Sequence, residues 1–425
     1  MSLMERGTMR KKAAAAALAL MMLCCAAGCS APAATDAPES PESEFGGVRD
    51  ERESQSAAPA PAPAPSAPKP AAVPTLDERA AEKAASLTLE QKVAQLFVVT
   101  PEAITGVDTA TQAGSATQQA LAAYPVGGLV YFQKNLLTAD QTREMIANSQ
   151  AFAQDACGLP LLVGVDEEGG TVSRIGGNPG FDISNEGNMA DVGAAGDTAQ
   201  AKAVAARIGG YLSDLGFNLD FAPDSDVCGD PSTDVMALRS FGTDPAIVGS
   251  MVSAQVEGFA EAGVLCSAKH FPGIGGVMGD SHEGAIVSEK TLDELRDWEL
   301  APFKAAIDAG VPMVMVGHLT APNAFGSDVP ASLNPAAVTD LLRGELGFQG
   351  LVITDSLSMG AVGDFCTPDQ AGVAALEAGA DLVLMPEDFA AAYQGVLDAV
   401  SEGALSEERI DQSVLRIVKA KLAFE

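Results

Sequence analysis

The chain has 425 residues, of which 47% are hydrophobic, and a formal net charge of −32 at pH 7. A chain of this length and apolar content can bury the core of a large globular domain. Its acidic balance argues against nucleic acid as a partner, because phosphate binding requires a basic surface.

The first 29 residues have the pattern of a secretory signal. Basic residues between Arg6 and Lys12 precede an apolar run over 13–27 that is too short to span a bilayer comfortably. The run ends in Ala26-Ala27-Gly28-Cys29, which resembles the bacterial lipoprotein signal, in which the cysteine is lipidated and becomes the new N-terminus. An ordinary secretory signal and an N-terminal membrane anchor are the alternatives. All three predict a protein outside the cytoplasm, and lipidation of Cys29 predicts attachment to the cell membrane.

Residues 30–74 are predicted to form a disordered linker. They are rich in Ser, Glu, Ala and Pro, they contain almost no large apolar residue, and they include an alternating Ala-Pro run over 58–65. A segment of this composition cannot build a core, and its proline-rich half favours an extended, semi-rigid spacer. The remaining residues, 75–425, are long enough for one large domain.

Eight short runs rich in Val, Leu and Ile recur along this domain, separated by longer segments with helical spacing. The pattern is typical of parallel strands joined by helices. The runs cover 95–99, 128–132, 161–166, 218–222, 265–270, 312–318, 351–355 and 381–385. Eight such units predict a single (β/α)8 barrel of the TIM type. The competing fold, an open doubly wound sheet, usually carries a glycine-rich phosphate turn after its first strand, and none follows Val99.

One connecting helix shows its boundaries clearly. Thr291 and Glu294 have the spacing of a capping box, and Gly310 is placed to end the last turn. Pro302 predicts that the helix breaks or restarts between these limits.

Polar residues follow four of the predicted strands directly. Asp166 ends the third strand, Lys269 and His270 the fifth, His318 the sixth and Asp355 the seventh. Because active sites in barrel enzymes lie at the carboxyl ends of the strands, we expect these side chains to converge at one mouth.

Two further segments supply polar groups suited to a sugar. Asp166-Glu167-Glu168-Gly169-Gly170 is followed by Arg174, and Arg239 occurs in Leu238-Arg239-Ser240-Phe241-Gly242. Sugar hydroxyl groups are bound by such mixtures of carboxylate acceptors and guanidinium donors. Taken alone, Arg239 fits a surface ion pair equally well.

Two of the three histidines, His270 and His282, lie in the glycine-rich stretch 269–282, which also contains Asp280. Imidazole is suited to proton transfer near neutral pH, and a carboxylate two residues away can orient its ring. Together with a rigid carboxylate at Asp355, this predicts retaining glycoside hydrolysis, with Asp355 as nucleophile and His282 as acid and base. The alternative reading of Asp355 is a helix N-cap.

These segments resemble glycoside hydrolase family 3, and in particular its single-domain β-N-acetylhexosaminidase branch. The matching segments are Val165–Gly170 with Arg174, Arg239–Gly242, Lys269–Gly273, Asp280–His282 and Thr354–Met359. The resemblance implies a (β/α)8 barrel and removal of terminal β-linked N-acetylglucosamine without metal or organic cofactor, from a glycan such as a peptidoglycan fragment.

The resemblance also implies a role for each site residue. Asp355 is the nucleophile, His282 the acid/base and Asp280 its partner. The terminal sugar is bound by Asp166, Arg174, Arg239, Lys269 and His270. A monomer is the default expectation.

The chain departs from the family pattern at a few positions. Ile274 stands within the catalytic loop where histidine is common, which removes a polar contact. Glu167 replaces a common glutamine and Thr171 a common arginine. The change at Ile274 affects the expected loop conformation or leaving-group preference more than the reaction, because Asp280, His282 and Asp355 are all present.

Three other functions remain open on the sequence. A sugar-binding lipoprotein without catalysis is compatible with Ile274 and the long linker. A family 3 β-glycosidase or phosphorylase of other specificity would share the barrel. A metal-dependent hydrolase would use His270, His318 and Asp355, although the first strand lacks the His-x-His pair found in other barrels.

Four cysteines follow the signal and lipobox, namely Cys157, Cys228, Cys266 and Cys366, and they show no metal-ligand spacing. They are predicted to be buried thiols, although disulfides are permitted outside the cytoplasm.

Overall fold

The computed structural model describes residues 74–277, 279, 284 and 286–424. The predicted signal, most of the predicted linker and three of the predicted functional residues, Cys29, Asp280 and His282, lie outside the described residues.

Eight parallel strands form the centre of the domain, in the order β10-β1-β2-β3-β4-β5-β7-β9. They are β1 (Phe97–Val99), β2 (Gly128–Val130), β3 (Leu162–Val165), β4 (Leu219–Asp220), β5 (Leu265–Phe271), β7 (Met313–Val316), β9 (Leu351–Thr354) and β10 (Val383–Leu384). A parallel bridge between Ile353 and Leu382 joins the two ends of this series. The strands therefore close into a barrel. Seven of them lie within the predicted runs, and β5 extends one residue beyond its run, to Phe271.

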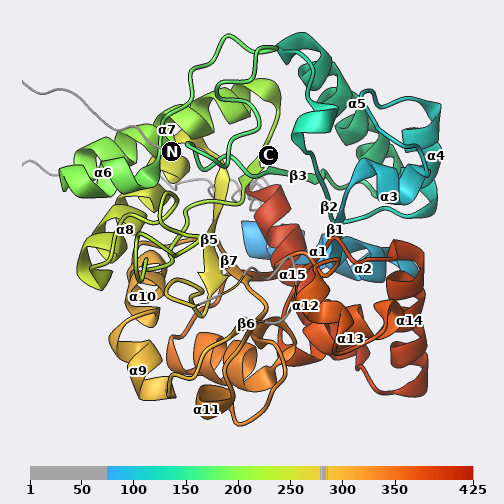
Figure 1. The fold of residues 1–425 in the computed structure, drawn as a ribbon. Helices are drawn as coiled ribbons and strands as arrows, with labels where there is room; N and C mark the ends of the chain where they lie inside the picture. The colour runs from blue at the N-terminus through green and yellow to red at the C-terminus, as the bar shows by residue number, and fades with distance from the viewer. Residues whose placement is uncertain (1–73, 278, 280–283, 285, 425) are drawn as a thin grey trace, which may run out of the picture. The chain divides into compact units, whose positions relative to one another are not determined.

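Helices surround the strands (Figure 1). The longer ones are α5 (Ala139–Cys157), α7 (Thr198–Leu215), α8 (Pro245–Ala262), α10 (Leu300–Asp308), α13 (Pro368–Ala378), α14 (Phe389–Glu402) and the π-helix η3 (Ala336–Glu345). Shorter ones are α2 (Leu89–Gln95), α3 (Pro101–Thr105), α4 (Ser115–Ala123), α6 (Met189–Ala195), α9 (Leu292–Asp297), α11 (Pro322–Phe325) and α12 (Gly360–Gly363), with 3-10 turns η1 (Gln133–Asn135) and η2 (Ala331–Leu333). The strands are buried on both faces, as their continuous apolar runs require.

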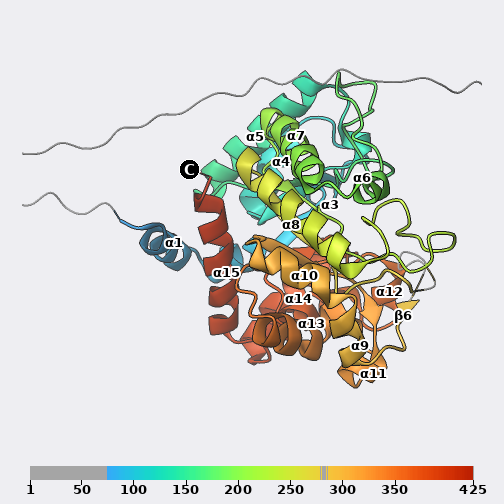
Figure 2. The same ribbon diagram turned by 90° about the vertical axis from the view of Figure 1, so that its left-hand side faces the viewer.

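Two terminal helices, α1 (Leu76–Ala85) and α15 (Glu407–Leu422), pack against each other at the end of the barrel where the strands begin. In Figure 2 α15 lies at the opposite end of the domain from α12 and β6 (Ile286–Val287). The strand β6 pairs in parallel with β8 (Leu319–Thr320) beside the mouth. The mouth of the barrel is therefore the end farthest from α15.

The predicted capping signals are confirmed. Thr291 caps α9 through a capping box with Glu294, and the helix stops at Asp297. A second helix, α10, begins at Leu300 with Pro302 in its first turn, so the helix restarts as expected. Gly310 adopts a left-handed backbone, φ 81°, shortly after α10 ends.

The cysteines agree in part with the prediction. Cys228 and Cys266 are buried, whereas Cys157 and Cys366 are only partly buried, and all four are free thiols. Among the described residues no helix combines the length and the apolar character that crossing a bilayer demands.

Candidate active site

A cavity of about 370 Å³ opens at the carboxyl ends of the barrel strands. Its lining includes all the predicted site residues that the structure describes, namely Asp166, Arg174, Arg239, Lys269, His270 and Asp355. Apolar side chains complete the wall, among them Phe132, Phe221, Met359 and Met385. For Asp166, Lys269, His270 and Asp355 the predicted convergence at one mouth is confirmed, whereas His318, which the same prediction included, does not line this cavity.

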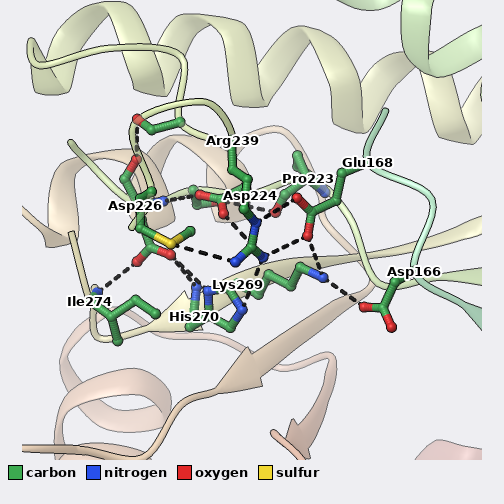
Figure 3. Close-up of polar contacts among 12 residues, drawn as sticks. Asp166, Glu168, Pro223, Asp224, Asp226, Arg239, Lys269, His270 and Ile274 are labelled. Carbon is green, nitrogen blue, oxygen red and sulfur yellow. Dashed lines mark hydrogen bonds and ion pairs between the residues drawn. The ribbon is translucent and has the colours of Figure 1, made fainter. Parts of the chain in front are cut away.

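Lys269 joins two acidic residues at the end of β3. Its Nζ lies 2.9 Å from Asp166 Oδ1 and 2.8 Å from Glu168 Oε1 (Figure 3). Burial opposes the charge of Lys269, but Asp166 and Glu168 outweigh it and raise the pKa of the ammonium group above its usual range. Lys269 is therefore a fixed cation within the cavity wall.

Arg239 forms the next link of this network. Its Nε and Nη2 donate to Glu168 Oε2 and Oε1, at 2.8 and 2.7 Å, a two-point contact that fixes the guanidinium plane. Burial tends to raise the pKa of Glu168, but the charges of Lys269 and Arg239 lower it overall. Because Glu168 is buried, the alternative that Arg239 makes only a surface ion pair is wrong.

Of two aspartates that follow β4, Asp226 holds His270 and Asp224 lies beside Arg239. Asp226 Oδ2 lies 2.7 Å from His270 Nδ1, and its Oδ1 accepts from the backbone N–H of Ile274 at 2.7 Å. Arg239 Nη2 lies 3.5 Å from His270 Nε2 and 3.5 Å from Asp224 Oδ2 (Figure 3). Asp226 thus sets the orientation of the His270 ring and also holds the start of the glycine-rich loop.

The pKa of Asp224 is raised well above its usual range by burial and by the neighbouring charge of Asp226. The contact with Arg239 is long, so it offsets only part of this effect. Asp224 is therefore predisposed to keep a proton within the network.

The backbone of β5 is irregular where Lys269 and His270 occur. The register between β5 and β7 shifts between Ala268 and Phe271, and the Lys269–His270 peptide bond is cis. Asp224 forms a parallel bridge with Lys269 next to this point. A register shift of this kind redirects side chains, and here Lys269 and His270 both reach the cavity.

Asp355 follows β9 and lies at the cavity wall. Its Oδ1 accepts from the backbone N–H of Ser356 at 2.7 Å. Burial tends to raise its pKa, but His270, His318, the Ser356 N–H and Lys269 together lower it below the usual 3.8. The next helix, α12, begins at Gly360 with Met359 as its N-cap, so the alternative that Asp355 caps a helix is wrong.

A loop after β3 presents Arg174 to the cavity. The carboxylate of Glu167 is fully buried and accepts from the backbone N–H groups of Arg174, Ile175 and Gly176 at 2.6–3.0 Å. The hydroxyl groups of Ser173 and Tyr211 donate to it as well. This loop places Arg174 Nη2 3.9 Å from Asp166 Oδ2.

Comparison with known proteins identifies the family. The family model "Glycosyl hydrolase family 3 N terminal domain" matches residues 88–420. This chain belongs to glycosyl hydrolase family 3. The resemblance inferred from the motif segments is confirmed, and so is the (β/α)8 barrel.

Two relatives of this family 3 chain are named beta-hexosaminidases. It is 36% identical over 323 residues to beta-hexosaminidase A of Pseudoalteromonas piscicida, covering 70% of the chain and 53% of that protein. It is 35% identical over 366 residues to beta-hexosaminidase LpqI of Mycobacterium tuberculosis, covering 84% of the chain and 86% of that protein. The chain thus spans about half of the first relative's length and most of the second's.

A solved structure agrees with the fold of the family 3 chain. A family 3 beta-N-acetylglucosaminidase from Paenibacillus sp. str. FPU-7 superposes with a TM-score of 0.74 at 37% identity. The match covers 80% of this chain and 63% of that one.

Sequence reasoning missed two residues in the site of this family 3 chain and undervalued a third. Asp224 and Asp226 follow the fourth strand, just as the predicted polar residues follow their strands, and that position was the available signal. Glu168 has no assigned role in the sequence prediction, yet it is the partner of both Lys269 and Arg239. The contacts of Asp226 with His270 and of Glu168 with Arg239 join residues 44 and 71 positions apart, a separation that no local pattern contains.

The metal-binding alternative requires His270, His318 and Asp355 to act together as ligands. Among the described residues these three do not form a group with metal-ligand geometry. Both ring nitrogens of His318 are within hydrogen-bond distance of Ser332 Oγ and the Ser356 carbonyl oxygen. A different set, Asp224, Asp226 and His270, brings ligand atoms within 4.8 Å of one another. The guanidinium of Arg239 contacts two of these three residues, so a cation already lies against them.

Ile274, which stands where histidine is common in the family, occupies an apolar environment in the structure. Its side chain is 9% exposed and packs in a small apolar cluster with Met236, Ile286 and Leu319. Next to it, a Cβ on Gly275 would lie 1.9 Å from the carbonyl oxygen of Val227, so only glycine fits there. Apolar packing therefore holds this part of the loop.

Proposed function

We propose that this chain is an exo-acting, retaining β-N-acetylglucosaminidase that removes terminal, non-reducing β-linked N-acetylglucosamine. One observation carries the proposal. A partly buried carboxylate with a lowered pKa, Asp355, lines the same cavity as the donors and acceptors Lys269, Arg239 and Asp166. The named hexosaminidase relatives and the family 3 beta-N-acetylglucosaminidase structure support the choice of sugar.

The size of the cavity supports action at a chain end. About 370 Å³ is at the small end of the range for ligand sites in proteins. Such a cavity accommodates one terminal sugar better than an internal stretch of a polysaccharide.

The sugar is held by fixed hydrogen-bond donors and by a fixed acceptor. Lys269 and Arg239 are cations that can donate to hydroxyl oxygens, and Asp166 can accept from hydroxyl groups. Salt bridges and burial hold these side chains before the substrate binds. Substrate binding therefore costs little side-chain conformational entropy. In this way the sugar's anomeric carbon is presented to Asp355.

Reaction begins when a carboxylate oxygen of Asp355 forms a bond to the anomeric carbon. The bond from that carbon to the leaving oxygen breaks, and this oxygen takes a proton from His282. The lowered pKa of Asp355 keeps it ionised, as a nucleophile must be. His282 and its partner Asp280 lie outside the described residues, so their roles are part of the proposal.

Water completes the reaction. It gives a proton to His282 and attacks the anomeric carbon, and the ester bond to Asp355 breaks. Two displacements at one carbon return it to its original configuration, and the carboxylate is regenerated.

The cellular setting that we propose is the outside of the membrane. Lipidation at Cys29 and a spacer over 30–74 are inferred from the sequence alone. Peptidoglycan fragments with terminal N-acetylglucosamine are the natural substrates that this setting favours. Fractionation of cells, with a Cys29→Ala variant as control, tests the anchor.

The activity is tested with the p-nitrophenyl β-glycosides of N-acetylglucosamine and glucose, comparing wild type and Asp355→Ala. The proposal expects release of p-nitrophenol from the N-acetylglucosamine compound alone, abolished by the substitution. Absence of turnover by folded wild-type protein would instead favour a sugar-binding protein. Detection of a sugar 1-phosphate in phosphate buffer would favour phosphorolysis, and loss of activity with a chelator would favour a metal-dependent hydrolase.

A further inference from the structure

His318 is a buried histidine close to the proposed nucleophile, Asp355. The catalytic scheme assigns no role to His318. It follows β7 and is 1% exposed. Its Nε2 lies 2.9 Å from the carbonyl oxygen of Ser356, the residue directly after Asp355, and its Nδ1 lies 2.7 Å from Ser332 Oγ. His318 is not one of the described residues that line the cavity.

The contact with Ser356 determines where the ring carries hydrogen. A carbonyl oxygen can only accept, so Nε2 must carry the proton that is shared in this bond. Nδ1 can then accept from the Ser332 hydroxyl in a neutral ring or donate to it in a charged ring. The bond to Ser356 is therefore present in either charge state.

This bond holds the backbone that follows the nucleophile. The Ser356 carbonyl oxygen also accepts from the N–H of Met359 at 3.1 Å, and the N–H of Leu357 donates to the carbonyl of Leu384 at 2.9 Å. The peptide unit between Ser356 and Leu357 is thus bonded at both of its polar ends. One of these bonds comes from His318 and another from the end of β10.

The same turn directs the carboxylate of Asp355. The N–H of Ser356 donates to Asp355 Oδ1 at 2.7 Å, and the N–H of Asp355 itself donates to the carbonyl of Val316 at 2.8 Å. With Oδ1 held by Ser356, the other oxygen is left to attack. Any shift of residue 356 would therefore move the attacking oxygen.

We propose that His318 is a positioning residue for the nucleophile, acting through its Nε2–H bond to the Ser356 carbonyl. The inference rests on the proposed function. Loss of this bond would let the turn move, and a misplacement of about 1 Å costs roughly 100-fold in rate when a reacting group must be held in line.

The experiment compares three variants of the full chain, His318→Leu, His318→Gln and His318→Asn. The amide nitrogen of glutamine can donate from the Nε2 position, whereas the shorter asparagine reaches only the Nδ1 position and its contact with Ser332. Asparagine is therefore the matched control for a polar residue that lacks the proposed bond. Each variant is first tested for folding by its melting temperature.

Three quantities separate the proposed role from a merely structural one. The kcat/KM for p-nitrophenyl β-N-acetylglucosaminide reports attack by Asp355. The same constant for the 2,4-dinitrophenyl glycoside reports attack on a leaving group that needs no acid. The inhibition constant of N-acetylglucosamine reports sugar binding.

For His318→Leu we expect kcat/KM to fall about 100-fold on both substrates, with the inhibition constant within about threefold of wild type. His318→Gln should recover at least about tenfold of that loss, and His318→Asn should not. If His318→Leu does not fold, the comparison of glutamine with asparagine decides alone.

Other results would overturn the inference. These are a His318→Leu kcat/KM close to wild type, a loss that disappears with the 2,4-dinitrophenyl substrate, or equal activity of the glutamine and asparagine variants. With an active wild type, each of them leaves the proposed function intact. An inactive but folded wild type would refute the proposed function, and the role of His318 with it.

Discussion

The guanidinium of Arg239 and the carboxylate of Glu168, 71 residues apart in the sequence, form two hydrogen bonds of 2.8 and 2.7 Å beside the cavity. The pair is largely buried, and Glu168 also contacts Lys269. One carboxylate thereby determines the position of two cations that the proposed function assigns to the sugar. This relationship makes Arg239 sensitive to the shape of its replacement as well as to its charge.

Replacing Arg239 with lysine keeps the charge but loses the planar two-point contact. We expect kcat/KM to fall by roughly 10- to 100-fold, because a single ammonium group cannot hold both carboxylate oxygens and also face the cavity. Steady-state kinetics on the p-nitrophenyl substrate check this. A variant with kinetics equal to wild type would show that charge alone suffices at this position.

The lowered pKa of Asp355 predicts a specific pH profile. Its pKa lies below the usual 3.8, so the carboxylate is already ionised at pH 5 and stays so as pH rises. With a 2,4-dinitrophenyl glycoside, which needs no acid, kcat/KM should therefore be flat between about pH 5 and 8. An acidic limb with an apparent pKa above 5 would contradict the assignment of Asp355.

Packing of Ile274 is expected to contribute to stability. Truncation to alanine would leave a cavity among Met236, Ile286 and Leu319. The free energy of unfolding should fall by about 2 kcal/mol or more, whereas the matched change to valine should cost about 1 kcal/mol. Denaturant unfolding checks both values, and equal effects of the two variants would argue against a close-packed site.

A buried lysine at the opposite end of the barrel links stability to pH. Lys421 is fully buried and donates to Gln95 Oε1 at 2.6 Å, and burial lowers its pKa to about 7. Between pH 7 and 10.5 the unfolded chain binds the proton that the folded chain has lost. Folding therefore becomes more favourable as pH rises through this window, by on the order of 1.4 kcal/mol per pH unit.

Lys421→Met removes this titration. The variant should be more stable than wild type at pH 7, and the difference should shrink toward pH 10. Lys419→Met is the matched control, because Lys419 is half exposed and pairs with the exposed Asp77. Thermal unfolding across this pH range measures both, and a parallel response of the two variants would contradict the assignment to Lys421.

Asp381 is the centre of a buried ionic cluster at the start of β10. Its oxygens contact Arg343 at 2.6 Å and Arg416 at 3.0 Å, and they also accept from Ser413 and the N–H of Val352. Asp381→Asn leaves two arginines without their carboxylate, so we expect a loss of about 3–5 kcal/mol in the free energy of unfolding. The kcat of the folded fraction should be unchanged. A small loss would mean that water or backbone carbonyls replace the carboxylate.

Much of the fold follows from local sequence patterns. The eight apolar runs coincide with the eight barrel strands, and the capping box at Thr291 and the restart at Pro302 occur where the residues place them. These features depend on burial along a strand and on hydrogen bonds between residues three or four apart, so neighbouring residues are sufficient to specify them. The predicted barrel also places Asp166, Lys269 and Asp355 close together, because parallel strands end at one mouth.

The sequence by itself determined the barrel, the family and the residue types at the strand ends. Only the tertiary structure decided which carboxylate serves which cation, that Asp226 orients His270, that Ile274 packs against Leu319, and that His318 contacts Ser356. The physical reason is that these choices depend on distances between chain segments far apart in sequence. Hydrogen bonds and ion pairs change over fractions of an ångström, and closure of the barrel sets those distances.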